Sequence, residues 1–254
     1  MGVIDLHAHV LHGLDDGPTS LEQSLAMLRM AAAAGTKEIV ATPHFSRKHP
    51  WQAALAQRRW EELQHLAGDA ICVRKGCEVE LAPEAVSRVL AAPQGFTLGG
   101  TRYLLVEIPD DLHPDKAEPL LGELQAAGLR VILAHPELHP VLAGQRRRVR
   151  RWVEGGLLVQ ANASSFLGLS GAAAGRSASR WLKQGLVHFI ASNGHDLNYR
   201  PPRLDAARLV LAGDLPPELL DLVFEQHPRQ LLRNESLPAG PIRVPGLGRR
   251  WWPF

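Results

Sequence analysis

The sequence predicts an α/β fold, a distorted (β/α)7 barrel related to the TIM barrel. Seven short apolar runs, each suited to a buried parallel strand, recur at 3–7, 37–42, 70–75, 103–108, 130–134, 157–161 and 187–191. Amphipathic or Ala/Leu-rich stretches between them are long enough for helices. Strands that alternate with helices imply a parallel sheet, and seven such units in 254 residues favour a barrel over an open sheet.

The first helix carries the clearest boundary signals of these helical stretches. Thr19 and Ser20 are capping residues, Glu22 and Gln23 stand at capping-box spacings from them, and Gly35 follows the expected end. Further helices are expected near 52–66, 83–91, 114–127, 140–154, 173–184 and 203–212, with a final pair near 216–226 and 228–233. Each apolar run is therefore followed by a helix, as a barrel of β/α units requires.

Composition and charge favour one globular domain. An apolar content of 45% is enough to bury a full core, and no linker, low-complexity tract or repeat divides the chain. We expect a single domain over residues 1–254, with residues 242–254 as a basic and aromatic tail that packs on its own barrel. The formal charge of +2, from 28 basic and 26 acidic residues, is too balanced for a nucleic-acid partner.

The sequence also predicts a cytoplasmic protein. Cys72 and Cys77 are the only cysteines, and their spacing fits no disulfide framework or CxxC site, so a reducing compartment is expected. The first residues do not combine a basic segment with an apolar one, and no apolar run approaches the roughly 20 residues of a transmembrane span. The oligomeric state stays open, with a homo-oligomer among the options.

Metal-ligating residue types follow the predicted strands. His7 and His9 stand at positions i and i+2 of the first strand, so their side chains share one face. Six of the seven strand ends carry a histidine or a carboxylate. The candidates in chain order are His7, His9, Asp15, Asp16, His44, Glu78, Glu107, His135 and His195, with Asn193 beside the last. Barrels of this kind keep their chemistry at the carboxyl ends of the strands, so we expect one shared multi-metal centre.

The donor set and the missing motifs indicate hydrolysis without a protein nucleophile. Histidine nitrogens mixed with carboxylate oxygens suit Zn²⁺, Mn²⁺ or Fe²⁺. Two ions about 3.5–4 Å apart that share Glu78 or a hydroxide generate a nucleophile at neutral pH and bind an anionic substrate. The sequence has no Cys-x5-Arg loop, no GxSxG elbow and no GxxxxGK[ST] loop, so covalent and P-loop mechanisms lack their residues.

An ordered set of motifs resembles a known family. The motifs are Asp5-Leu6-His7-Ala8-His9, Leu14-Asp15-Asp16-Gly17, Ala41-Thr42-Pro43-His44, Gly76-Cys77-Glu78, Val106-Glu107, Ala134-His135-Pro136-Glu137, Ala191-Ser192-Asn193-Gly194-His195 and Arg200-Pro201-Pro202. They resemble the PHP (polymerase and histidinol phosphatase) superfamily, and within it the CpsB/YwqE-type bacterial tyrosine-protein phosphatases of capsule and exopolysaccharide synthesis. The likeness extends to about Leu232. It implies the PHP fold, a distorted (β/α)7 barrel with a trinuclear, typically manganese, centre.

The resemblance also implies a role for each matching residue. His7, His9 and Glu78, with Asn193, would hold one ion; Glu78, Glu107 and His135 a second; Asp16, His44 and His195 a third. Mn²⁺ is the expected metal, with two to three ions, and Fe or Zn as alternatives. Arg200, Asp16 and His44 are the expected catalytic residues, while Arg200 and Arg47 are expected to bind the phosphate. Asp15 is expected at the surface or behind the ligands.

Two positions depart from the family pattern. The family has Ser-Asp-x-His where this chain has Asn193, so a carboxylate ligand is replaced by an amide. One unit charge at about 4 Å and an effective dielectric near 20 is worth about 4 kcal/mol, so metal affinity at this position should fall. Relatives carry an arginine where this chain has Leu138, and His139, Arg47 or Arg176 would have to replace it.

The leading functional hypothesis is a phosphatase that removes phosphate from phosphotyrosine by attack of a metal-bridged hydroxide. Its expected partner is a phosphorylated protein, such as the tail of a bacterial tyrosine kinase linked to polysaccharide synthesis. One alternative is a phosphatase for a small ester such as histidinol phosphate. A second is an amidohydrolase, which also opens with His-x-His but needs a bridging lysine where this chain has Glu107. A third is a weakened barrel with a regulatory or binding role, suggested by Asn193 and Leu138.

Overall fold

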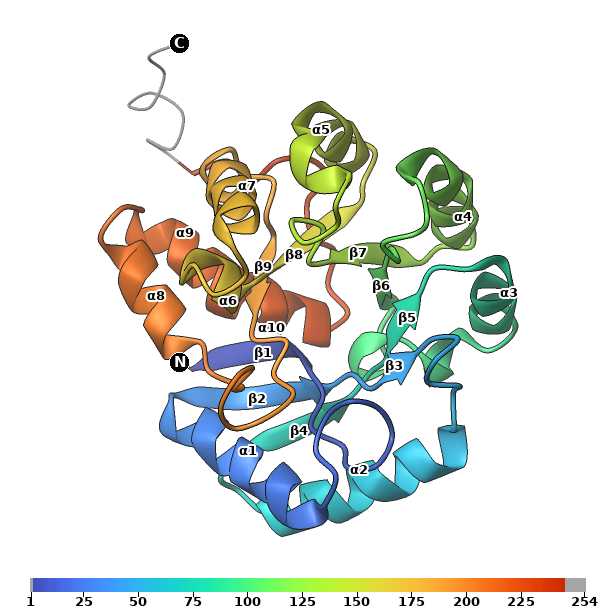
Figure 1. Ribbon diagram of the computed structural model, residues 1–254, viewed down its shortest axis with the longest axis vertical. Coiled ribbons are helices and arrows are strands. Elements are labelled where there is room, and N and C mark those ends of the chain that lie inside the picture. The colour runs from blue at the N-terminus through green and yellow to red at the C-terminus, as the bar shows by residue number, and fades with distance from the viewer. Residues whose placement is uncertain (1, 245–254) are drawn as a thin grey trace.

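Two parallel sheets form the centre of the molecule in the computed structural model, which describes residues 2–244 (Figure 1). The smaller sheet has the order β1-β2-β4, and the larger has the order β3-β5-β6-β7-β8-β9. The strands are β1 (Val3–Ala8), β2 (Thr36–Ala41), β3 (His44–Phe45), β4 (Cys72–Lys75), β5 (Glu78–Glu80), β6 (Tyr103–Glu107), β7 (Arg130–Ala134), β8 (Leu158–Asn162) and β9 (Phe189–Ala191). The predicted α/β architecture with parallel strands is confirmed.

Two of the seven predicted strands are each followed by a further short strand that the sequence did not predict. The predicted strand at 37–42 corresponds to β2, and β3 follows it after a break at Pro43, which lacks a backbone donor. The predicted strand at 70–75 corresponds to β4, and β5 follows it after a break at Gly76. A Cβ on Gly76 would lie 2.7 Å from Leu98 Cδ2 and 2.8 Å from Val40 Cγ1, so only glycine fits there. The breaks create two sheets where the sequence predicts one, and they set His44 directly opposite Glu78 in the β3–β5 pairing.

The first and last strands meet at their carboxyl ends. The backbone N–H of His9 donates to the carbonyl of Gly194 at 2.8 Å, and that of Asn193 donates to the carbonyl of His7 at 2.9 Å. A parallel bridge joins Ala8 to Gly194. These bonds connect the small sheet to the large one at the ends of β1 and β9.

The helices lie outside the strands (Figure 1). They are α1 (Leu21–Ala33), α2 (Ala53–Ala67), α3 (Pro83–Ala91), α4 (Pro114–Ala126), α5 (Arg146–Glu154), α6 (Ala163–Phe166), α7 (Ala172–Lys183), α8 (Asp205–Ala212), α9 (Pro217–Asp221) and α10 (His227–Leu232). Short 3₁₀ turns occupy Pro93–Gly95, Leu98–Gly100 and Leu142–Gly144, and a π-helical turn, Leu222–Gln226, joins α9 to α10. Every predicted helical stretch contains a helix, and Ser20 caps α1 by accepting from the backbone N–H of Gln23.

Alternation along the strands divides the buried side chains between two layers. Leu104 and Val106 on β6 pack in the large cluster between sheet and helices, whereas Tyr103 and Leu105 pack in a second cluster with Ile4 and other strand residues. Successive side chains of a strand point to opposite faces, so one face of β6 meets the helices and the other the interior. The apolar interior cluster leaves the carboxyl ends of the strands free for polar groups.

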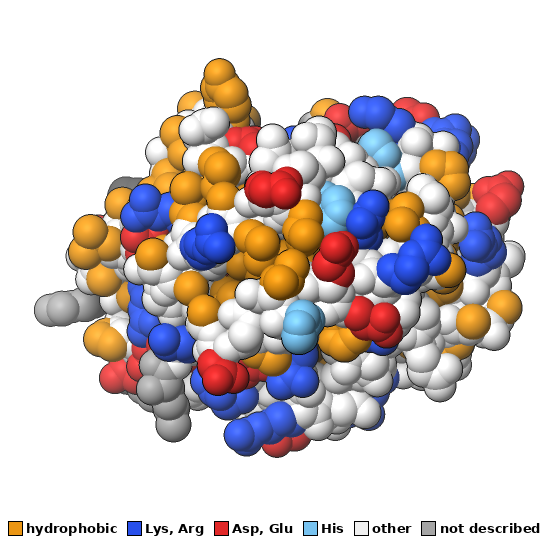
Figure 2. Space-filling view, turned by 90° about the horizontal axis from the view of Figure 1, so that it is seen from below, with side chains coloured by type: hydrophobic (Ala, Val, Ile, Leu, Met, Phe, Trp, Pro, Cys, Tyr) orange, Lys and Arg blue, Asp and Glu red, His pale blue; other side chains and the backbone are white. Residues whose placement is uncertain are grey.

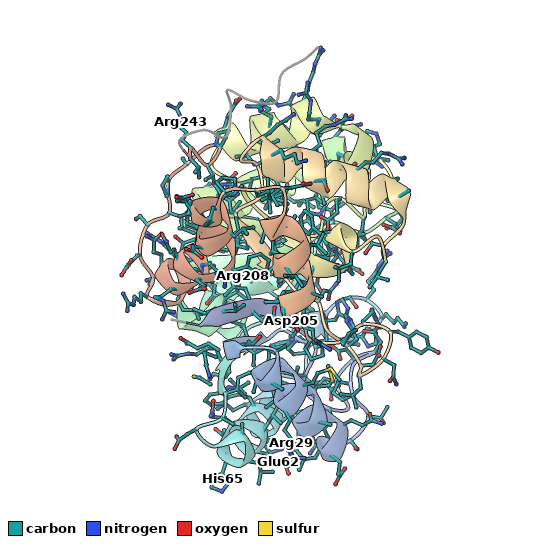
Figure 3. The ribbon with its side chains drawn as sticks, turned by 90° about the vertical axis from the view of Figure 1, so that its left-hand side faces the viewer. Arg29, Glu62, His65, Asp205, Arg208 and Arg243 are labelled. Atoms are coloured by element: carbon teal, nitrogen blue, oxygen red, sulfur yellow. The ribbon has the colours of Figure 1, made fainter. Side chains whose placement is uncertain are left out.

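The outer surface of α1 and α2 carries side chains of all types. Figure 2 shows this side of the molecule, where apolar, basic and acidic side chains are interspersed and neither charge dominates. Figure 3 places Arg208 on α8, and its guanidinium bonds Asp221 at 2.7 Å and Glu225 at 2.6 Å, which ties α8 to the turn after α9. The mixture of charges in Figure 2 agrees with the small net charge of the chain.

No helix among residues 2–244 is long and apolar enough to cross a membrane. Residues 245–254 of the predicted tail lie outside the described residues. The start of the tail is placed: the backbone N–H of Ile242 donates to the carbonyl of Gly185 at 2.7 Å, and Val244 is buried in the core. The prediction of one domain over the whole chain stays a prediction.

Candidate metal centre

Glu78 is the centre of a group of histidines at the carboxyl ends of the strands. Its Oε2 lies 3.2 Å from His7 Nε2, 3.2 Å from His9 Nε2 and 3.1 Å from His44 Nδ1. Its Oε1 lies 2.9 Å from His135 Nε2. The Glu78 side chain is fully buried. Four histidines from three strand ends therefore direct imidazole nitrogens at one carboxylate, which is the bridging position expected from the sequence.

Three further predicted ligands border this group. Asp16 Oδ1 lies 3.3 Å from His195 Nε2 and 3.6 Å from His44 Nε2. Glu107 lies 4.0 Å from both His44 Nδ1 and His135 Nε2. Potential ligand atoms converge in three overlapping sets, which are His9, Asp16, His44 and His195; His7, Glu78 and His135; and His44, Glu78 and Glu107. The structure thus brings eight predicted ligands together and places His9 with Asp16, His44 and His195 as well as beside His7.

The donor atoms have the properties of a site built for cations. Glu78 Oε2, His44 Nδ1, His195 Nε2 and Asn193 Oδ1 are buried and have no hydrogen-bond partner in the described part of the chain. A buried polar atom without a partner is costly, and such atoms are rare in folded proteins. These four all belong to predicted ligands. A divalent ion that accepts both nitrogen and oxygen donors would satisfy them, so the residues present fit a transition-metal centre.

Two side chains behind the ligands orient the first pair of histidines. His7 Nδ1 lies 3.0 Å from Gln160 Oε1, and His9 Nδ1 lies 2.7 Å from Asp15 Oδ2. Both partners are acceptors, so each Nδ1 carries the proton and each Nε2 presents its lone pair to the centre. The two Nε2 atoms are 3.2 Å apart, a spacing that suits a shared cation better than two neutral rings.

The segment after β9 holds Asn193 and His195 in place. Asn193 has a φ of 51°, a left-handed conformation that Asn tolerates better than most residues. Its carbonyl accepts from His195 Nδ1 at 2.8 Å, which leaves Nε2 of that ring facing Asp16. Ser192 anchors the segment to β1, because its N–H and hydroxyl both donate to the carboxylate of Asp5. The backbone is therefore fixed at the position where the family pattern has aspartate.

The pKa shifts reflect the crowding of like groups. Burial raises the pKa of Glu107, and the negative charge of Glu78 raises it further. Burial and the neighbouring charge of His9 lower the pKa of His44 to about 4. The pKa of Asp16 is well below its usual range because it faces the His195 ring and accepts a hydrogen bond from Arg200. Protonated histidines would compete with a cation for these carboxylates, so bound metal and neutral rings go together.

The two predicted phosphate-binding arginines differ in position. Arg200 Nη2 lies 3.0 Å from Asp16 Oδ2, and its side chain is 47% exposed, so it stands at the mouth of the ligand group. The Arg47 side chain is 77% exposed and pairs with Asp111 at 3.2 Å and with Glu80 at 3.7 Å. The structure therefore brings Arg200 to the centre and leaves Arg47 among carboxylates outside the ligand group.

Leu138 lies beside the ligands, at the position where the resemblance to the family leads us to expect arginine. It lines a hollow of about 190 Å³ together with Glu107 and His135. His139, one of the predicted replacements, accepts from the backbone N–H groups of Val141 and Leu142 and has a structural role. The hollow thus has an apolar side chain on its wall, which suits an aromatic ring better than a second phosphate contact.

Several supporting residues were not predicted from the sequence. The sixth strand offers no charged candidate, yet Gln160 at its end orients His7. Asp5, part of the first motif, holds the segment after β9 instead of a metal. Glu137 follows His135 and accepts from the backbone of Asn162, which joins the ends of β7 and β8. Asp5 and Glu137 stand two residues from a predicted ligand and Gln160 stands at the end of a predicted strand, which was the available signal, but their partners are distant along the chain.

The profile of the family described as "Capsular polysaccharide synthesis, CpsB/CapC" matches residues 3–233. The chain is 30% identical to the tyrosine-protein phosphatase YwqE of Bacillus subtilis over 95% of its length and 97% of that protein. It is 27% identical to the tyrosine-protein phosphatase CpsB of Streptococcus agalactiae, over 92% of this chain and 100% of that protein.

A solved structure resembles the whole fold. A chain from the crystal structures of YwqE from Bacillus subtilis and CpsB from Streptococcus pneumoniae, described as unique metal-dependent tyrosine phosphatases, superposes with a TM-score of 0.85 and 29% identity. The match covers 95% of this chain and 100% of that one. The resemblance expected from the motifs is confirmed, and this chain belongs to the CpsB/CapC family of capsular polysaccharide synthesis proteins.

Proposed function

We propose that this protein is a metal-dependent tyrosine-protein phosphatase. The observation that carries the proposal is the position of Glu78, whose two buried oxygens lie within 3.2 Å of nitrogens from four histidines. Relatives that align over almost the whole chain are tyrosine-protein phosphatases. A site of this kind, on a fold shared with metal-dependent phosphatases, supports phosphate ester hydrolysis more strongly than any other reaction class.

We propose Mn²⁺ as the metal, with two to three ions per chain. The proposed ligands are His7, His9, Asp16, His44, Glu78, Glu107, His135, Asn193 and His195. Bound ions supply positive charge to the phosphate and make a water molecule acidic enough to attack at neutral pH. The nitrogen and oxygen donors suit Mn²⁺, Fe²⁺ and Zn²⁺ alike, so metal analysis of the purified protein decides among them.

The protein's own residues bind and orient the substrate. Arg200 donates to Asp16 and is open to solvent on its outer side, so a phosphate that enters the mouth meets its guanidinium. Asp16 also contacts His195, which fixes the guanidinium against the ligand group. Leu138 offers the phenol ring an apolar contact beside Glu107. Arg200, Asp16 and His44 therefore keep the catalytic roles proposed for them, while Arg47 is the weaker candidate for phosphate binding.

The proposed substrate is a phosphotyrosine-containing protein linked to capsule or exopolysaccharide synthesis. The family description supports the link to capsule, and the names of the relatives support the phosphotyrosine. We propose the tail of a bacterial tyrosine kinase as the partner. Both cysteines are free thiols, which suits the reducing cytoplasm as the place of action.

A substrate panel tests the proposal. The protein loaded with Mn²⁺ is expected to release phosphate from a phosphotyrosine peptide faster than from a phosphoserine peptide or histidinol phosphate. Activity on histidinol phosphate alone would contradict the tyrosine phosphatase assignment. His7→Ala should abolish turnover and keep the fold, because His7 faces the polar centre, whereas the exposed His65 on α2, changed to alanine, should alter neither.

A second candidate function is a phosphoprotein-binding module with weak turnover. The observation that favours it is Asn193, whose buried Oδ1 has no hydrogen-bond partner among the described residues and provides no charge where the resemblance to the family leads us to expect a carboxylate. Such a module would bind the phosphotyrosine peptide with a hydrolysis rate near background. If Asn193→Asp restores activity, the wild-type protein is an impaired enzyme. If the wild type is fully active, the hypothesis of a binding module is excluded.

A further inference from the structure

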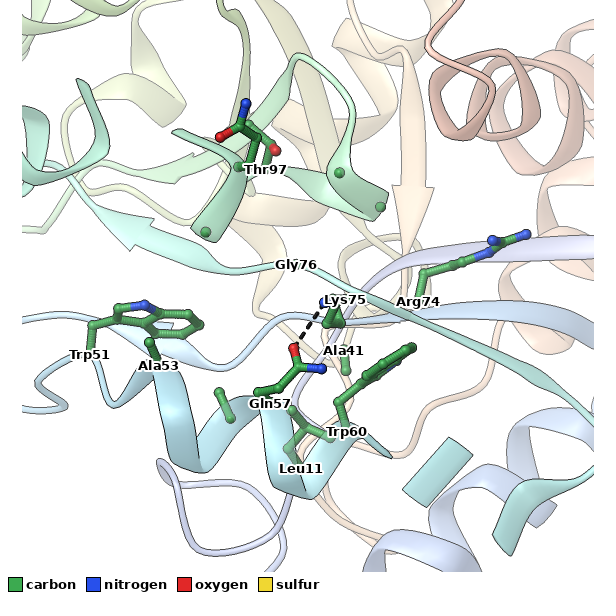
Figure 4. Close-up of a pocket in the computed structure, with 15 residues that line it drawn as sticks. Leu11, Ala41, Trp51, Ala53, Gln57, Trp60, Arg74, Lys75, Gly76 and Thr97 are labelled. Carbon is green, nitrogen blue, oxygen red and sulfur yellow. Dashed lines mark hydrogen bonds between the residues drawn. The ribbon is translucent and has the colours of Figure 1, made fainter. Parts of the chain in front are cut away.

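A cavity of about 540 Å³ lies in the seam between the two sheets, away from the ligand group (Figure 4). Its walls come from α2, the end of β4 and the segment with the two 3₁₀ turns before β6. A volume of this size is typical of small-molecule sites. None of the residues assigned to the metal centre lines it.

The cavity exists because β4 has an incompletely covered edge. Strand β4 pairs only with β2. On its other edge, two side chains of α2 take the place of a neighbouring strand at Val73: Gln64 Oε1 accepts from its N–H at 2.6 Å, and Trp60 Nε1 donates to its carbonyl at 2.8 Å. Lys75 is the next residue of β4 whose backbone groups face this edge, and the covering side chains of α2 end there. The break at Gly76 then opens the space beyond it.

One side of the cavity is aromatic and cationic. Trp51 and Trp60 line it, and Lys75 Nζ lies 4.8 Å from the centre of the Trp60 ring and 2.9 Å from Gln57 Oε1. In the described part of the chain, no carboxylate lies within ion-pair distance of this ammonium group. Figure 4 shows Lys75, Gln57 and Trp60 together on this side. An ammonium group on an aromatic face, with no anion to neutralise it, favours a negatively charged ligand.

A buried hydroxyl stands on the opposite side. Thr97 is 3% exposed and lines the cavity, and its Oγ1 has no hydrogen-bond partner among the described residues. Figure 4 shows it across the space from Lys75 and Gln57. A buried hydroxyl without a partner carries a desolvation cost that a polar ligand atom removes. The cavity therefore offers an ammonium group without an ion-pair partner and two indole rings on one side, and a hydroxyl without a hydrogen-bond partner on the other.

We propose that this cavity is a second ligand site, which binds a small planar aromatic anion. The indoles provide flat apolar contact, Lys75 provides the charge, and Thr97 provides one hydrogen bond to the far end of the ring. A cation is disfavoured because Lys75 is unpaired and none of the lining residues is acidic. This proposal does not depend on the proposed function, since it uses none of the residues of the metal centre.

Two matched fluorescent probes test the site. The full-length protein is titrated with 1-anilinonaphthalene-8-sulfonate, a planar aromatic anion, and with N-phenyl-1-naphthylamine, which has the same rings without the charge. Inorganic phosphate is present throughout to occupy the metal centre. We expect saturable binding of one sulfonate per chain, with quenching of tryptophan fluorescence, and weaker binding of the neutral probe.

Variants then locate the probe. Lys75→Met should weaken the sulfonate about tenfold and leave the neutral probe unchanged, whereas Lys116→Met on α4 should affect neither. Thr97→Val should weaken both probes, and Ala56→Phe, which fills the cavity from α2, should abolish saturable binding. Circular dichroism and metal content confirm folding of each variant. Sulfonate binding that is unchanged in both Lys75→Met and Ala56→Phe, or absent from the wild type, overturns the proposal.

Discussion

Asp15 Oδ2 lies 2.7 Å from Nδ1 of His9, and the same oxygen accepts from the backbone N–H of His44 at 2.9 Å. Burial alone would raise the pKa of Asp15, but the charge and hydrogen bond of His9 outweigh it and hold the pKa at about 2. The carboxylate is therefore ionised at neutral pH. Asp15 thus fixes the proton on Nδ1 of His9 and holds the backbone of His44, although Asp15 is not itself one of the proposed ligands.

We expect Asp15→Asn to weaken metal binding about 10- to 100-fold, the usual effect of the loss of a carboxylate behind a histidine ligand. The amide keeps the shape of the side chain but removes the charge that stabilises the oriented ring. Mn²⁺ titration with a metal indicator measures the affinity. Asp69→Asn, an exposed change after α2, serves as the control. An unchanged Mn²⁺ affinity in Asp15→Asn would show that Asp15 only shapes the loop.

Asn193→Asp is expected to raise metal affinity at least tenfold and to raise turnover. Aspartate, like asparagine, tolerates the left-handed backbone at a φ of 51°, and it replaces the unpartnered Oδ1 with a charged oxygen. The gain follows from one more negative charge near the ions. Metal content after dialysis and the rate on a phosphotyrosine peptide are the measurements.

Asn198→Asp adds the same charge in the exposed loop and is the control for Asn193→Asp. Equal gains in the two variants would mean that general electrostatic attraction explains the effect. A loss of metal in Asn193→Asp would indicate that the site has adapted to the amide.

Arg200→Met is expected to raise KM for a phosphotyrosine peptide about 10- to 100-fold, since a charge-assisted hydrogen bond is worth about 1.5–3 kcal/mol. Metal content should stay close to that of the wild type, because the guanidinium of Arg200 bonds Asp16 alone among the proposed ligands in the described part of the chain, and the carbonyl of Arg200 that accepts from the His195 N–H is kept in the variant. Arg203→Met removes a nearby exposed guanidinium that pairs with Asp205, and it should leave KM unchanged. Steady-state kinetics with both variants make the comparison, and similar KM values would remove Arg200 from substrate binding.

Much of the fold was predictable because each element has a strong local signal. All seven apolar runs contain strands, and Ser20 caps α1 as its spacing indicates. The additional short strands β3 and β5 were not predicted. Pro43 and Gly76 are visible breakers, but only the packing of Leu98 and Val40 against Gly76 shows that the chain must change sheets there. Local propensity gives the strands, whereas contacts between distant segments decide their pairing.

In the candidate site, too, local signals were predictable and contacts between distant segments were not. The ligand types were predictable because the carboxyl ends of parallel strands meet, so residues after each strand come together. The hydrogen bonds behind them were not, because Gln160 is 153 residues from His7 and Asp5 is 187 residues from Ser192. The orientation of Arg47 toward Asp111 likewise depends on a surface loop that carries no pattern in the sequence.

His188 is buried just before β9, at the end of that strand away from the ligands. Burial lowers its pKa to about 3, and its Nδ1 accepts from the backbone N–H of Val159, so the folded protein keeps this ring neutral. The unfolded chain binds a proton below the usual pKa of 6.5, so stability is fully present above pH 6.5 and falls by about 1.4 kcal/mol per pH unit as the pH decreases toward 3. His188→Gln removes this titration, and its destabilisation relative to wild type should therefore be about 2 kcal/mol smaller at pH 5 than at pH 7. Urea unfolding of both proteins at the two pH values measures it, and an equal difference at both would show that His188 is protonated in the fold.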